Sequence, residues 1–92
     1  MATMSAHQSH PDIVKRLRRA EGHLRSISTM IEEGRSCVDL AQQLHAVEAA
    51  IASAKRELIQ DHIEHCLGDG VAGGGMTGKA ALSEFKQLAK YL

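Results

Sequence analysis

Apolar residues in the first third of the chain recur at alternating steps of four and three positions. They are Ile13, Leu17, Ala20, Leu24, Ile27 and Ile31. This spacing places all of them on one face of an α-helix. Pro11 suits the first turn of a helix, and Gly34 follows the last apolar position, where glycine commonly ends one. We therefore predict an amphipathic helix from about Pro11 to Gly34.

A longer apolar pattern follows, and no glycine or proline interrupts it between positions 35 and 67. Ser36, with Asp39 three positions later, is close to a capping box, which marks a helix start. The apolar stripe comprises Leu40, Leu44, Val47, Ile51, Ala54 and Leu58. At the same spacing it continues to His62 and Cys66. The pattern predicts one long helix whose apolar stripe ends in an imidazole and a thiol.

The remainder of the chain predicts a link and a short third helix. Six glycines lie between positions 68 and 78, a composition that favours a flexible link. The third helix then has an apolar face made of Ala81 or Leu82, Phe85, Leu88 and Leu92. Residues 1–10 are polar and without periodicity, so we expect a flexible N-terminal arm before a single helical domain over residues 11–92.

These elements predict an all-α fold with three helices per chain, since no strand pattern occurs. Two long helices and a short one cannot enclose a core alone, because each long helix has an apolar stripe and only one full-length partner. We therefore expect a dimer that forms an antiparallel four-helix bundle.

Composition narrows the range of functions. No apolar run approaches the roughly 20 residues of a membrane span, so we expect a soluble protein without a membrane partner. Aromatic residues are only 2% of the chain, which argues against the stacking platforms of proteins that bind single-stranded nucleic acid. Two cysteines are too few for a disulfide scaffold, and the N-terminus lacks the apolar region of a signal peptide. A cytoplasmic location is expected.

The two cysteines and one histidine of the long helix predict a site shared between chains. His62 follows Cys37 by 25 positions, which on one helix is on the order of 37 Å. If two copies of this helix pack antiparallel across a two-fold axis, Cys37 of one copy meets His62 and Cys66 of the other. Symmetry then gives two equivalent sites in the dimer.

The donor set of this shared site indicates a metal. Two thiolates and one imidazole are soft ligands that suit Cu(I), and Zn(II) or Ni(II) becomes an alternative if a fourth ligand joins. His7 or His10 in the N-terminal arm can supply that ligand. The shared set therefore predicts a metal site with Cu(I) as its first candidate.

Each residue of this set also has a plain structural interpretation, since a single buried cysteine is usually a small core residue. The other histidines carry less signal. His23 and His45 fall at surface positions, and His65 points away from His62 on the helix. We therefore expect none of these three among the principal ligands.

Clustered cations are the second functional signal, because the net charge of the chain is zero. The basic residues of the first helix are Lys15, Arg16, Arg18, Arg19 and Arg25, and those of the second are Lys55 and Arg56. A solvated face is the ordinary explanation for such residues. In a symmetric oligomer, however, each cluster is duplicated and can bind phosphates of double-stranded DNA.

Four features of the chain together match a known family. They are the run IVKRLRRAEGHL, the segment CVDLAQQLHAVEAAI, the ending HIEHCL, and the spacing of Cys37, His62 and Cys66. Over about residues 11–92 the chain resembles the CsoR/RcnR family of bacterial metal-sensing repressors. The resemblance implies a dimer of antiparallel long helices that pairs again into a homotetramer, a dimer of dimers. It also implies that the metal-free tetramer binds operator DNA and that the metal-bound form releases it.

Within that family the residue set tracks the inducer, and the set Cys37, His62 and Cys66 resembles that of the copper(I) sensors. Some nickel sensors share this set and recruit an N-terminal histidine. Cobalt and nickel sensors usually have His in place of Cys66, formaldehyde sensors have Glu there, and persulfide sensors lack His62. The resemblance therefore favours Cu(I), and it leaves nickel, cobalt, persulfide and formaldehyde as alternatives.

The resemblance also assigns supporting roles. Glu84 matches an acidic residue that copper sensors use beside the metal ligands to transmit binding. Arg16 matches the family's DNA-contacting position. Two positions depart from the family. Ser36, just before Cys37 and so in the surroundings of the metal, stands where copper sensors commonly have a Tyr, and Ser53 stands where a basic DNA-binding residue is common.

Two other classes of function are weighed against a repressor. A copper storage or trafficking module would bind copper without DNA and would not need the basic stretch. An enzyme is not expected, because a Cys–His pair without an orienting acid meets few requirements of nucleophilic catalysis.

Overall fold

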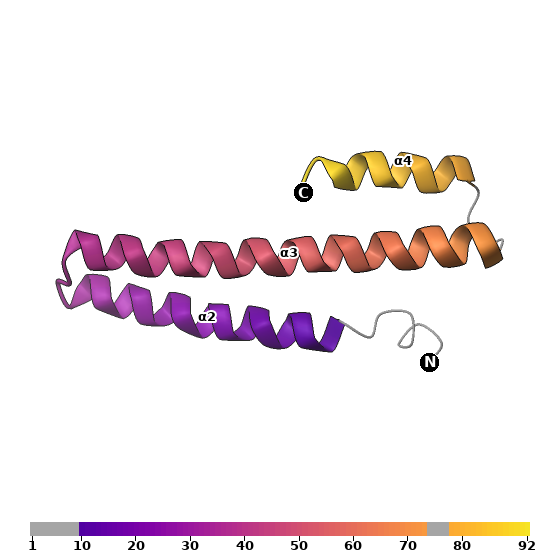
Figure 1. Ribbon diagram of the computed structural model, residues 1–92. Coiled ribbons are helices and arrows are strands. Elements are labelled where there is room, and N and C mark those ends of the chain that lie inside the picture. Colours follow the sequence, from indigo (N-terminus) through magenta and orange to yellow (C-terminus); the bar gives the residue numbers. More distant parts are fainter. Residues whose placement is uncertain (1–9, 74–77) are drawn as a thin grey trace. The chain divides into compact units, whose positions relative to one another are not determined.

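The computed structural model describes the backbone of residues 10–73 and 78–92, and the side chains of residues 10–65 and 78–92. Three helices make up this part of the chain, α2 (His10–Glu32), α3 (Cys37–Gly73) and α4 (Gly78–Ala89), and the described residues contain no strand (Figure 1). The predicted all-α fold with three helices is therefore confirmed. None of the described helices is both long enough and apolar enough to cross a lipid bilayer.

The turn between α2 and α3 follows from three local signals. Gly34 has a φ of 80°, a left-handed conformation that a residue with a Cβ adopts only at a cost. Its N–H donates to the carbonyl of Ile31, and the N–H of Arg35 donates to the carbonyl of Met30, which together form a Schellman motif. The Ser36 hydroxyl then accepts from the N–H of Asp39 at 3.1 Å and caps α3. The predicted end of one helix and start of the next are both confirmed.

The described residues fall into two compact units, residues 12–54 in one and residues 10–11, 55–73 and 78–92 in the other. In the first unit α2 runs antiparallel beside the first part of α3, as Figure 1 shows. Its buried apolar side chains are Ile13, Ala20, Ile27, Val47 and Ala54. In the second unit Ile59 of α3 and Ala81 of α4 are buried.

Only about half of the residues in each predicted apolar stripe are buried in the single chain. The buried positions of α2 are seven residues apart, and so are the buried Val47 and Ala54 of α3. The alternate positions stay 40–55% exposed in the single chain, namely Leu17, Leu24, Ile31, Leu44 and Ile51. We call these five residues the apolar row. One α2–α3 pair can bury only the half of each stripe that faces the other helix.

The structure corrects several predicted boundaries. α2 begins at His10, one residue before Pro11. α3 continues to Gly73 and so includes part of the stretch predicted as a link, because glycine lowers helix propensity by about 1 kcal/mol without preventing a helix. The rest of the predicted arm and link, residues 1–9 and 74–77, lies outside the described residues.

The inward face of α4 also differs from the prediction. Ala81 is buried while Glu84 and Leu88 are half-buried, whereas Leu82 and Phe85 are exposed. Leu92 lies beyond the end of the helix at Ala89. The prediction considered apolar residues alone, and it missed that a carboxylate occupies this face.

Candidate functional site

Cys37 is the first residue of α3 and its side chain is exposed. The Ser36 cap fixes the start of the helix at this point, so the thiol is held on the first turn. Sequence analysis assigned Ser36 to the surroundings of the metal, and in the structure its hydroxyl is used as the helix cap. Cys37 is therefore an accessible thiol on a well-defined helix end.

His62 lies on α3 and is held by α4. Its Nε2 pairs with the carboxylate of Glu84, and both side chains are about one-third exposed. A carboxylate on one ring nitrogen sets the tautomer and orientation of the imidazole, which is the common arrangement for a histidine that binds metal through its other nitrogen. The structure thus brings together the predicted ligand His62 and the predicted supporting residue Glu84.

His10 of α2 also lies in this unit. Together with His62 it lines a pocket of about 260 Å³, whose other lining residues are Leu58, Ile59 and Leu88. The Nε2 of His10 is 3.8 Å from Oδ2 of Asp61. One predicted extra ligand therefore lines the same pocket as one predicted principal ligand.

Sequence analysis missed Asp61, whose side chain is only 13% exposed and lies between two histidines. Besides its approach to His10, its Oδ1 is 3.2 Å from Nδ1 of His65, and that nitrogen donates to the main-chain carbonyl of Asp61 at 2.8 Å. The spacing of four between Asp61 and His65 was the available signal, because such pairs lie on one face of a helix.

Two members of the predicted ligand set lie outside the described residues. They are His7 and the side chain of Cys66, although position 66 falls within α3. Among the side chains that are described, no three His, Cys, Asp or Glu residues are grouped so as to hold a metal ion. The set of Cys37, His62 and Cys66 thus remains a prediction.

The basic residues of the sequence prediction differ in their surroundings. Lys15, Arg18 and Arg19 on α2 are exposed, as are Lys55 and Arg56 on α3. Arg16 is half-buried, and its Nη2 donates to the hydroxyl of Ser53 on α3 at 3.0 Å. Arg16 is therefore a basic residue of this set whose guanidinium forms a hydrogen bond with the neighbouring helix α3.

The expectation that His23 is a solvated surface residue is wrong. His23 is half-buried, and its Nε2 lies 2.6 Å from Oε1 of Gln43, which links α2 to α3. Its position next to the apolar stripe was the missed signal, since a residue flanking the buried face of a helix commonly reaches the neighbouring helix. His45 is exposed, as expected.

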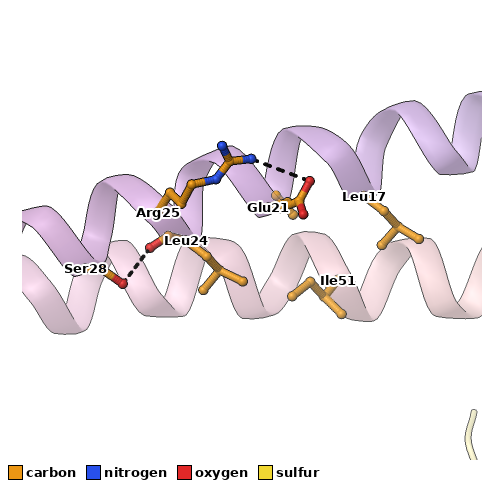
Figure 2. Close-up of a pocket in the computed structure, with 7 residues that line it drawn as sticks. Leu17, Glu21, Leu24, Arg25, Ser28 and Ile51 are labelled. Carbon is orange, nitrogen blue, oxygen red and sulfur yellow. Dashed lines mark hydrogen bonds and ion pairs between the residues drawn. The ribbon is translucent and has the colours of Figure 1, made fainter.

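Three residues of the apolar row, Leu17, Leu24 and Ile51, line a groove of about 420 Å³ in the unit of residues 12–54. Figure 2 shows Leu17 and Leu24 of α2 and Ile51 of α3 side by side along it. At its edge the Arg25 guanidinium is 3.6 Å from the Glu21 carboxylate, and the Ser28 hydroxyl donates to the carbonyl of Leu24. A groove with an apolar floor and a polar edge is typical of an interface with another protein surface.

Comparisons with known proteins place these features in a family. A family model described as a metal-sensitive transcriptional repressor matches residues 9–91. The copper-sensing transcriptional repressor CsoR of Bacillus subtilis is 40% identical over 78 residues, which are 85% of this chain and 75% of that protein. The copper-sensing transcriptional repressor RicR of Mycobacterium tuberculosis is 40% identical over 77 residues, 84% of this chain and 80% of that protein.

No solved structure matches the chain significantly. The match to the family model extends over almost the whole chain, and it includes α2, α3 and α4. This chain therefore belongs to the family of metal-sensitive transcriptional repressors, which regulate transcription and are not enzymes.

Proposed function

We propose that this repressor binds double-stranded operator DNA in its metal-free form and releases it when Cu(I) binds. Each Cu(I) is held by Cys37 of one chain and by His62 and Cys66 of its partner. The observation that carries this proposal is the pairing of the His62 Nε2 with the carboxylate of Glu84. His62 lies four positions before Cys66 on the same helix. Metal coordination by that ring then uses Nδ1.

The chemistry of the donors supports copper. Two thiolates and an imidazole are a soft set, and soft ligands select Cu(I) over harder divalent ions. The relatives CsoR of Bacillus subtilis and RicR of Mycobacterium tuberculosis are both named copper-sensing repressors. When bound, the metal supplies bonds that join two chains, and those bonds hold one arrangement of the dimer.

The apolar row supports a second copy of the chain as the other half of the site. Five exposed aliphatic side chains at heptad-like spacing are typical of a helix pair that packs against another pair. We propose an antiparallel four-helix bundle for the dimer, and a homotetramer built from two such dimers. A repressor acts on the chromosome, and we therefore place the protein in the cytoplasm.

Release of DNA is a shift between two populations. Metal lowers DNA affinity only if it binds the DNA-incompetent arrangement more tightly than the DNA-competent one. Each difference of about 1.4 kcal/mol in metal binding produces a tenfold loss of DNA affinity. Linking Cys37 of one chain to His62 and Cys66 of another is a bond between chains, so it acts directly on the arrangement that presents Arg16 and its neighbours to DNA.

A fourth ligand would extend the range of metals. His10 lines the same pocket as His62, and this position supports His10 as a residue that would complete a Ni(II) or Zn(II) site. Such a site is the alternative to three-ligand Cu(I) binding. Persulfide or formaldehyde sensing, and copper storage without DNA binding, are the other outcomes that the experiment distinguishes.

The test is fluorescence anisotropy of the reduced protein, without oxygen, on a labelled duplex from upstream of its own gene. The duplex is titrated in turn with Cu(I), Ni(II), a persulfide donor and formaldehyde. Release by near-stoichiometric Cu(I) alone supports the copper switch. Release by another inducer alone keeps the repressor and refutes the copper assignment, and copper binding without DNA binding indicates storage.

A separate variant tests the assignment of Cys37 as a metal ligand. Cys37→Ala is expected to bind the duplex as tightly as the unchanged protein, because the thiol takes no part in DNA contact, and to stay bound when Cu(I) is added. Ser36 is left unchanged, so the cap of α3 is preserved. A Cys37→Ala protein that copper still releases would refute the role of this thiol.

A further inference from the structure

His23 is held by a hydrogen bond between two helices. Its Nε2 donates to Oε1 of Gln43 at 2.6 Å, and both side chains are half-buried. The bond joins α2 to α3 within the unit of residues 12–54, since 20 positions separate the two residues along the chain. The described residues supply this ring with no second hydrogen bond or ion pair. The imidazole therefore has a defined position at one side of the helix pair.

His23 continues a row of basic side chains on α2. Lys15, Arg19 and His23 follow one another at steps of four positions, so they lie on the same side of the helix. Lys15 and Arg19 are exposed. We call these three residues the basic row. At a rise of 1.5 Å per residue, the row extends over about 12 Å of the helix.

The acidic residues near the basic row are few. Glu21 is the only Asp or Glu between positions 13 and 31. It lines the groove shown in Figure 2, where its carboxylate is 3.6 Å from the guanidinium of Arg25. On α3 the acidic residue nearest in sequence to Gln43 is Asp39, which is exposed and lies one turn away. The charged groups beside His23 are thus cations on its own helix and Asp39 on the neighbouring one.

The bond to Gln43 decides what protonation does to His23. An amide oxygen only accepts hydrogen bonds, so Nε2, which faces that oxygen, carries the proton of the neutral imidazole. Nδ1 is then an acceptor, and it cannot donate to a phosphate oxygen. When the ring takes up a second proton, Nδ1 becomes a donor and the ring becomes a cation. Histidine is the side chain that makes this change within the physiological pH range.

We propose that His23 is a proton-dependent phosphate contact of the DNA-binding surface, held in place by Gln43 and continuous with Lys15 and Arg19. In its protonated form the ring adds a third positive charge to the basic row and donates from Nδ1 to a backbone phosphate. In its neutral form it makes no such contact. This inference rests on the proposed function, because it takes the basic side of α2 as a surface that binds DNA.

A proton-dependent contact leaves two signatures. DNA binding and protonation of His23 favour each other, so DNA affinity increases as the pH falls, and the protein takes up a proton when the complex forms. The contact also neutralises one more phosphate, so at low pH the slope of log affinity against log salt becomes steeper by about 0.9 for each engaged copy. A histidine that only joined α2 to α3 would give neither signature, because Nε2 donates to Gln43 in both protonation states.

The experiment is fluorescence anisotropy of the reduced, metal-free protein on the duplex from upstream of its own gene, at several salt concentrations. It is done at about pH 6 and about pH 8, which bracket the change in charge of a histidine. His23→Gln removes the titrating group and retains a polar side chain that can reach Gln43, and His23→Arg carries a permanent charge. His45→Gln is the matched control, because His45 is an exposed histidine of α3. Far-UV circular dichroism and urea unfolding at both pH values check the fold of each variant.

The expected results follow from the added contact. On going to the lower pH, the unchanged protein and His45→Gln gain the same affinity and the same increase in salt slope. His23→Gln gains about twofold to tenfold less affinity for each engaged copy, the range of one hydrogen bond. His23→Arg binds at the higher pH about as tightly as the unchanged protein does at the lower pH. Calorimetry in two buffers of different ionisation enthalpy shows proton uptake by the unchanged protein that His23→Gln lacks.

Two kinds of result would overturn the inference, and a third belongs to the proposed function. Equal pH dependence in His23→Gln and the unchanged protein refutes the contact, and so does a loss in His23→Gln that is the same at both pH values. If His23→Gln does not fold, His23→Arg decides, since full pH dependence in that variant also refutes it. In each of these cases DNA binding by the unchanged protein stands. If the unchanged protein binds the duplex at neither pH, the proposed function fails and the inference fails with it.

Discussion

At the scale of single residues, Glu84 sets the orientation of the His62 imidazole. The imidazole is one-third exposed and would rotate readily if nothing held it, but the carboxylate of α4 engages its Nε2. An imidazole whose orientation is set before a metal arrives loses less entropy on binding. Because Glu84 lies on a different helix from His62, a movement of α4 would change the orientation of the imidazole.

This coupling gives the first prediction. Glu84→Ala is expected to weaken Cu(I) binding by about 10- to 100-fold, because the imidazole loses its fixed orientation. The measurement is competition for Cu(I) against a chelator of known affinity. Glu84→Gln retains an oxygen acceptor, so its Cu(I) affinity should lie between that of Glu84→Ala and that of the unchanged protein. Lys86→Ala on the same helix should bind Cu(I) as tightly as the unchanged protein. Equal Cu(I) affinity in Glu84→Ala would contradict the assigned role.

At the scale of elements, the α2–α3 turn depends on the backbone conformation of one glycine. The Schellman motif requires a residue with positive φ after α2, and Gly34 supplies it at 80°. Gly22 lies inside α2, where glycine is a poor helix former. Outside the backbone of its own helix, a Cβ at Gly22 would meet no atom of the described chain within 4 Å.

The two glycines therefore form a matched pair with opposite expected effects. Gly34→Ala should lower the free energy of unfolding by about 1–2 kcal/mol, because a Cβ strains the left-handed conformation. Gly22→Ala should raise it by up to about 1 kcal/mol, because alanine is a better helix former and the space is open.

The measurement is urea unfolding at one fixed protein concentration, since assembly contributes to apparent stability. Neither substitution introduces a clash, because a Cβ at Gly34 would also meet nothing within 4 Å. A stabilising Gly34→Ala would contradict the role of positive φ. A destabilising Gly22→Ala would indicate that a second chain approaches α2 closely at this point.

At the scale of the whole molecule, a single chain leaves the apolar row exposed to water. Burying each aliphatic side chain of this row contributes roughly 1.5–3 kcal/mol, so leaving five of them in water removes a large part of the stabilisation available to a short chain. A second copy that covers the row recovers this contribution. In the proposed dimer, the same contact would bring the proposed metal ligands of two chains into one site.

The prediction at this scale concerns Ile51, the residue of α3 that lines the groove. Ile51→Glu places a charge against the apolar surface of the partner and should raise the dimer dissociation constant by about a hundredfold or more. Sedimentation velocity over a concentration series measures this. Gln42→Glu, on an exposed position of the same helix, adds the same charge and should leave assembly unchanged. An Ile51→Glu protein that assembles normally would rule out the row as the interface.

The amino-acid sequence by itself determined the features that depend on near neighbours. Helix periodicity, the Ser36 cap and the Gly34 turn each involve residues within a few positions, so their physics is readable along the chain. The three helices, the unbroken start of α3 and the family could all be predicted in this way. The donor types of the candidate site were equally readable, and its assembly from two chains remains a prediction.

The tertiary structure alone decided which distant residues meet. His62 and Glu84 are 22 positions apart, and His23 and Gln43 are 20 apart. Whether such side chains touch depends on how far each helix is rotated about its axis, and the spacing of apolar residues does not determine that rotation to within one side chain. Rotation also selected Ile27 and Val47 for burial and left Leu24 and Ile51 exposed. Local pattern therefore specified the helices, and packing specified the pairs on which metal sensing and DNA binding are proposed to depend.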